Sequence, residues 1–246
     1  MGQFFAKDFT GAPFELFGPA HLIALAIVVV AVLGVPYLKD HSTPRLRTRI
    51  RYTLAAILVM NETLWHIWNY TTGQWTIQTM LPLHLCSVLV WVSAYMLVTK
   101  NYTIYEFAYF MGIAGGMQAL LTPDVGRYGF PHFRFFQTFI SHGTIVFSAV
   151  YMTVVEGYRP TWKSFQHVFI YGNLYMLVIG AINTLLGSNY LFIMHKPETA
   201  SLLDLLGPWP WYVLVMEAIA LVLCMLLYMP FAIKDRRALL NSARAA

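Results

Sequence analysis

The chain contains seven apolar runs, each about as long as the helix that a bilayer core requires, roughly 17–25 residues. They cover residues 17–38, 52–70, 81–98, 103–122, 131–155, 165–186 and 209–233. The connections between most of them are short, and no run alternates apolar and polar residues as a half-buried strand would. We therefore predict one transmembrane domain, residues 1–246, that folds as an all-α bundle of seven membrane helices.

The composition supports a membrane environment. Of the 246 residues, 58% are hydrophobic and 11% are charged, whereas soluble domains have roughly 25% charged residues. The chain therefore has too few charged groups to cover a water-facing surface. Its net charge of +5 comes from basic clusters in loops and the tail, which suit an anionic leaflet. We predict a multi-pass protein of the cell membrane whose partners are membrane lipids, without nucleic-acid binding.

Basic residues lie mainly on one side of the predicted bundle. The connections at 39–51, 99–102 and 156–164 and the C-terminal tail contain most of the 16 Lys and Arg residues. The other side holds only Lys7, Arg127, Arg134 and Lys196. Because basic loops stay in the cytoplasm, we predict that the N-terminus is outside and the C-terminus is cytoplasmic.

Each predicted helix carries a polar side chain in the half nearer the outside. Such groups are expensive in hydrocarbon and by default suggest function. Their gathering in one half predicts a polar cavity open to the outside, and independent hydrogen bonds between packed helices are the alternative. We assign catalytic roles to His84, His142, Glu62 and Cys86. Ligand contacts are assigned to His21, His66, Gln118, Asn183, Asn189 and Glu217.

The local spacing of these residues limits what each can do. Glu62 and His66 lie one helical turn apart, so the carboxylate could orient an imidazole that acts as a base, or the pair could only fix helix contacts. Pro82 suits a first helical turn, which places His84 in that turn. Side chains at i and i+2 of a helix point about 200° apart, so His84 could not activate Cys86 directly. A histidine from another helix could activate this thiol, and a small buried filler is its alternative role.

Three further patterns have mainly structural meaning. Gly112 and Gly116 have the GxxxG spacing of close helix packing. Residues 197–207 could form a short surface helix capped by Thr199 or Ser201. Several histidines with a carboxylate could assemble a zinc site, but the chain has no dense ligand spacing such as HxxxH. We therefore assign no metal and no cofactor.

Several short motifs resemble those of a known group. They are LPLHLC at 81–86, FISHGTIV at 139–146, NYLF at 189–192 and GPWPWY at 207–212. With FGPAHLIALAI at 17–27, their order is similar to that of YwaF-type bacterial integral membrane proteins over essentially the whole chain. The group is distantly similar to the animal transmembrane 164 acyltransferase, which is linked to ether phospholipid remodelling.

The resemblance implies a lipid acyltransferase with two histidines, at positions matching His84 and His142. In the animal protein a proposed catalytic cysteine directly precedes the first histidine, in a Pro-Cys-His sequence. Here Leu83 occupies that position and Cys86 stands two residues after His84. The two-histidine pattern is therefore kept, and the cysteine is displaced.

Three classes of function follow. The first is an enzyme that transfers or hydrolyses a lipid acyl group near the outer leaflet, with His84 or His142 as general base and a glutamate as its orienter. The second is a transporter or binding protein for a small polar solute, in which histidine protonation drives movement. The third is a structural membrane protein whose polar groups only join helices.

Overall fold

The computed structural model describes residues 2–197 and 202–245. Over these residues it is helical, without strands. The long helices are α1 (Pro19–Leu33), α3 (Pro44–Thr71), α4 (Leu85–Thr99), α5 (Tyr102–Leu121), α6 (Phe133–Val154), α7 (Trp162–Leu186) and α8 (Trp211–Ala245). The short elements are α2 (Val35–His41), η1 (Tyr190–Phe192) and η2 (Leu202–Leu206).

Within the described residues, three helical segments are long and apolar enough to cross a membrane. They are Pro19–His41, which joins α1 and α2, Trp162–Leu186 and Trp211–Ser242. The α4 helix is apolar but shorter. The fold is therefore all-α, as predicted, and contains membrane-length helices.

Several helix boundaries differ from the predicted segments because of local backbone chemistry. The first segment divides at Gly34, two residues before Pro36, which has no N–H for the helical ladder. The α3 helix begins eight residues earlier than predicted, because Pro44 occupies its first turn and the Thr43 hydroxyl accepts a hydrogen bond from the Leu46 amide. Its basic first turns had been excluded from an apolar segment.

The α4 helix begins four residues later than predicted. Pro82 lies in a turn before the helix, and His84 is the N-cap with extended backbone angles. The placement of His84 within the first helical turn was therefore wrong. The proposed caps of the 197–207 helix, Thr199 and Ser201, lie outside the described residues, and the part that is described forms the 3-10 helix η2.

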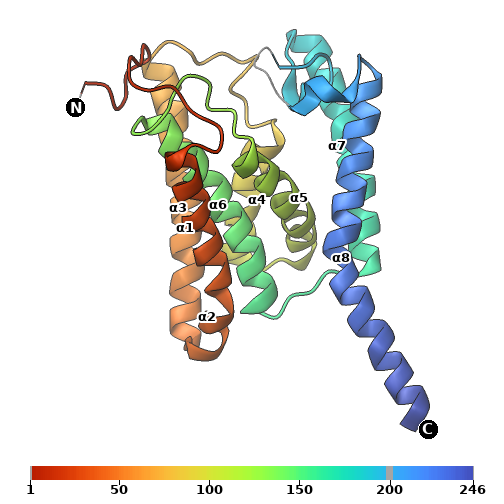
Figure 1. The fold of residues 1–246 in the computed structure, drawn as a ribbon. Coiled ribbons are helices and arrows are strands. Elements are labelled where there is room, and N and C mark those ends of the chain that lie inside the picture. The colour runs from red at the N-terminus through yellow and green to blue at the C-terminus, as the bar shows by residue number, and fades with distance from the viewer. Residues whose placement is uncertain (1, 198–201, 246) are drawn as a thin grey trace.

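The helices form two groups. The α3, α4, α5 and α6 helices pack on one another, and α1 and α2 pack on α6. The α7 and α8 helices lie side by side against α5, on one side of the bundle (Figure 1). The segments 2–18, 72–84, 122–132, 187–197 and 202–210 gather at the top of Figure 1, and we call this the long-loop end.

Glycines bring α5 and α6 close together. A Cβ at Gly116 would lie 2.7 Å from Val146 Cγ2, and one at Gly112 would lie 3.1 Å from Ile145 Cγ2. The GxxxG spacing thus serves the packing of α5 on α6.

We expect Gly116→Ala to lower the free energy of unfolding by about 1–3 kcal/mol, because the added methyl group overpacks this contact. Equilibrium unfolding in mixed micelles measures the change. Gly172→Ala is the matched control, because a Cβ there meets no atom within 4 Å. Equal stability of the two variants would contradict the close contact.

Candidate functional site

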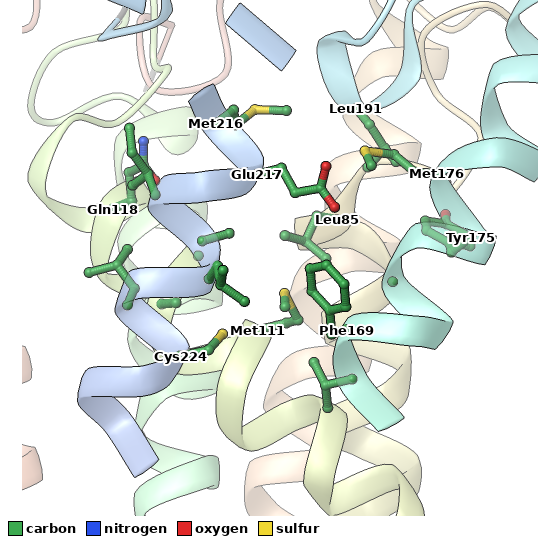
Figure 2. A pocket seen from close by; sticks show the side chains of 18 of the residues that line it. Leu85, Met111, Gln118, Phe169, Tyr175, Met176, Leu191, Met216, Glu217 and Cys224 are labelled. Carbon is green, nitrogen blue, oxygen red and sulfur yellow. The ribbon is translucent and has the colours of Figure 1, made fainter. Parts of the chain in front are cut away.

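A cavity of about 350 Å³ lies between α4 and α5 on one side and α7 and α8 on the other. Residues of the 187–210 segment, among them Leu191, Phe192 and Leu206, line it at the long-loop end. Apolar side chains form most of the remaining lining (Figure 2). The cavity exists because α7 and α8 lean on α5 instead of closing around α4.

The cavity brings together four of the ten predicted site residues, namely His84, Cys86, Gln118 and Glu217. Figure 2 shows Gln118 and Glu217 toward the long-loop end, whereas Met111 and Cys224 lie toward the other end. The lining is therefore graded, with polar groups near the loops and apolar groups farther down.

His84 is positioned by the segment that covers the cavity. Its Nδ1 accepts a hydrogen bond of 3.4 Å from the Leu191 amide, and its ring contacts the rings of Tyr190 and Phe192. A neutral imidazole that accepts at Nδ1 carries its proton on Nε2. His84 is therefore arranged as a hydrogen-bond donor through Nε2, and general-base action would require the other tautomer.

The backbone around His84 is held by two tyrosines that the sequence analysis did not select. Tyr175 donates a hydrogen bond of 2.9 Å to the Leu83 carbonyl. The Tyr190 hydroxyl accepts from the Leu81 amide at 2.9 Å and donates to the Ile77 carbonyl at 2.7 Å. Burial raises the pKa of Tyr190, so the hydroxyl keeps its proton. The NYLF motif was the available signal for Tyr190, and Tyr175 had none.

Two residues beside His84 have unusual backbone angles. Leu191 has φ 62° and Phe192 has φ 54°, in the left-handed region that large side chains rarely occupy. Tyr212 donates a hydrogen bond of 2.5 Å to the Phe192 carbonyl, which fixes this turn to α8. Strain of this kind is concentrated at functional sites. Here it occurs in the turn that covers the long-loop end of the cavity.

Cys86 is the second residue of α4 and lines the cavity. Glu62 and Arg134 are the nearby charged groups that act on its thiol. Because His84 is extended rather than helical, the 200° argument against contact between these two side chains does not apply.

Glu62 and His66 form the predicted pair but do not line the cavity. His66 Nε2 lies 3.7 Å from Glu62 Oε1, and His66 Nδ1 accepts a hydrogen bond of 3.1 Å from the Trp75 indole. Since an indole N–H only donates, Trp75 fixes the His66 proton on Nε2, facing the carboxylate. Arg134 stacks on Trp65 at 4.0 Å nearby.

His142 is also outside the cavity lining. Its Nδ1 donates to the Thr138 carbonyl at 2.8 Å, one turn earlier on α6. Its Nε2 is buried and has no partner among the described residues. Because its proton is on Nδ1, His142 could accept a proton at Nε2 as a base does, but His142 does not line the cavity.

The remaining predicted site residues hold the fold together. His21 accepts from the Phe17 amide and bonds the Leu120 carbonyl at 2.8 Å. Asn183 bonds the amide and the carbonyl of Tyr190. Asn189 accepts from the Met194 amide at 3.1 Å. The predicted cavity residues are thus divided among several places.

No three His, Cys, Asp or Glu side chains within residues 2–197 and 202–245 are grouped as metal ligands. The zinc alternative therefore gains no support from this geometry. The ionisable groups among the described lining residues of the cavity are Glu217, His84, Cys86, Tyr175 and Cys224.

The comparisons with known proteins give one match. The model of the TMEM164 family matches residues 16–228, which include every described residue that lines the cavity. No curated protein and no solved structure matches the chain. With its three apolar, membrane-length helices, the match identifies a membrane protein.

Proposed function

Because the chain belongs to the TMEM164 family, we propose that it acts on a membrane lipid, by transfer or hydrolysis of an acyl group held in the cavity. We further propose seven membrane spans in the cell membrane, with the long-loop end outside, because the opposite connections and the tail contain most of the Lys and Arg residues. The observation that carries the proposal is the graded cavity beside His84 and Cys86.

The dimensions of the cavity suit an acyl chain. On α5 the lining extends from Phe107 to Gln118, about 16 Å along the helix at 1.5 Å per residue. An apolar lining with a few placed polar groups is typical of sites for small apolar ligands. A chain with its ester group toward the long-loop end would put its carbonyl near His84.

The arrangement of His84 supports a role for this residue at that carbonyl. Its Nε2–H can donate to the carbonyl oxygen, where negative charge develops when a hydroxyl or water attacks. Cys86 is the second reactive group in the lining. Its sulfur could take the acyl group as a thioester while the ester C–O bond breaks and the thiol proton leaves with the lysophospholipid hydroxyl; attack by the acceptor hydroxyl would then break the C–S bond and return its proton to the thiol.

A transporter for a small polar solute has less support. The polar side chains predicted to share one cavity are divided between the cavity, the Glu62–His66 pair and contacts that hold loops. The cavity lining itself is mainly apolar.

Purified protein incubated with a phospholipid labelled in its acyl chain and with a lysophospholipid acceptor tests the activity. We expect labelled acceptor or free fatty acid in lipid extracts, and His84→Ala to reduce the rate about 100-fold or more, because one oxyanion donor is lost. His195→Ala, at a histidine outside the cavity lining, is the control. A rate unchanged in His84→Ala would overturn the role of this residue.

Cys86→Ala separates two chemical routes in the same assay. Loss of activity, with an acyl adduct on the wild-type thiol in intact-protein mass spectra, supports a covalent intermediate. Full activity assigns direct attack by the acceptor. The absence of any acyl transfer or hydrolysis would refute the enzyme proposal.

A further inference from the structure

The Glu217 side chain has a place in the cavity that the proposed acyl chemistry does not use. It extends from α8 into the cavity, toward Leu85 and Met176 (Figure 2). Within residues 2–197 and 202–245 it has no hydrogen bond and no ion pair. A carboxylate in apolar surroundings is costly without a partner. A bound ligand could supply the missing partner for this carboxylate.

The described part of the cavity lining supplies no Lys or Arg that could pair with Glu217. Lys196, from the segment that covers it, bonds the Asp204 carbonyl and lies 5.7 Å from the centre of the Tyr212 ring. Arg134, in the next polar cluster, donates to Gln137 and to the Asp124 carbonyl. Both cations are therefore held elsewhere.

Three aromatic side chains in the lining that Glu217 shares also favour a bound cation. Phe169 and Tyr175 come from α7, and Phe192 comes from the covering segment. The Tyr175 hydroxyl is bonded to the Leu83 carbonyl, which fixes the ring. Aromatic faces attract ammonium groups within about 6 Å, so these rings and the carboxylate favour the same kind of ligand group.

We propose that Glu217 recognises a positively charged amino group on an amphiphile whose apolar chain occupies the cavity. This proposal rests on the proposed function in one respect: both require an apolar acyl or alkyl chain to bind in the cavity. The group can belong to a free long-chain amine or to the headgroup of a zwitterionic lipid. An anionic end would be repelled by the carboxylate and would find no Lys or Arg among the described lining residues.

Native mass spectrometry of the full-length protein tests this with probes of one dodecyl chain length: dodecylamine, dodecanol and dodecanoate. We expect the amine to bind wild type about tenfold to hundredfold more tightly than the other two, as a charged hydrogen bond implies. Glu217→Gln keeps the shape of the side chain and should remove this preference. Glu15→Gln, at an exposed carboxylate outside the cavity lining, should keep it.

Equal binding of the three probes by wild type, or an unchanged preference in Glu217→Gln, would overturn the proposal and leave the lipid site intact. Loss of every probe in Gly172→Phe, a variant whose added phenyl ring occupies part of the cavity, shows that the probes bind in the cavity. Retention of the probes in that variant would overturn both this proposal and the lipid site. A lysophosphatidylethanolamine of the same chain length identifies the source of the amino group: binding like dodecylamine assigns a lipid headgroup, and weak binding assigns a free amine.

Discussion

Gly172→Phe is expected to remove about nine-tenths or more of the lipid that the protein retains through purification. Gly172 lines the cavity from α7, and a Cβ at this position meets no atom within 4 Å. The phenyl ring can therefore enter the cavity without displacing the backbone. Each methylene group that it excludes costs the ligand about 0.8 kcal/mol, so excluding two already weakens binding more than tenfold. Lipid extraction followed by mass spectrometry measures the retained amount.

Leu177→Phe is the matched control for this variant. Leu177 is on the same helix but 74% exposed on its outer side, and it does not line the cavity. It should retain lipid as wild type does. If Gly172→Phe is as stable as Leu177→Phe and still carries the same lipid, the cavity is not the lipid site.

Glu156→Leu is expected to lower the free energy of unfolding by about 3–5 kcal/mol, the effect of breaking a buried ion pair on one side. The Glu156 side chain is 7% exposed and lies 3.4 Å from Arg51 Nε, with Lys100 on its other oxygen. Arg51 also donates to the Leu97 carbonyl at 2.5 Å. The network joins α3, α4 and the end of α6, and none of its three charged side chains lines the cavity. Equilibrium unfolding in mixed micelles measures the loss.

The double variant Arg51→Leu/Glu156→Leu provides the control. Removing both charges leaves no buried unpaired ion and costs the hydrogen bond to the Leu97 carbonyl, so it should recover part of the loss seen in the single variant. Lipid retention should stay at the wild-type level in both variants when they are folded. A single variant as stable as wild type would show that the network contributes little.

The helical character of the protein was predictable because it depends on local sequence. The apolar runs are long and their connections are short, and the all-α prediction is confirmed over the described residues. The predicted helix boundaries were less accurate where charged residues continue a helix beyond its apolar segment, or where a proline lies just before the helix. The basic turns from Pro44 onward are helical, whereas Pro82 ends a turn instead of opening a helix.

The candidate site was predictable in its residue types but not in its grouping. Gln118 and Glu217 were selected because polar groups in apolar helices are expensive, and the structure places both in the cavity. His142 and Glu62 were selected by the same reasoning, yet neither lines it. Depth along a helix follows from residue number, but the direction of a side chain depends on how the helix is rotated against its neighbours.

The sequence by itself determined a helical chain, its apolar segments and the position of each polar residue along its segment, since each depends on composition within one segment. Only the tertiary structure decided that α7 and α8 lean on α5 and leave a cavity between them. It also decided that His84 faces this cavity as an N-cap held by Leu191, a residue more than a hundred positions away. Contacts of that range depend on packing between helices, which periodicity within a single helix does not specify.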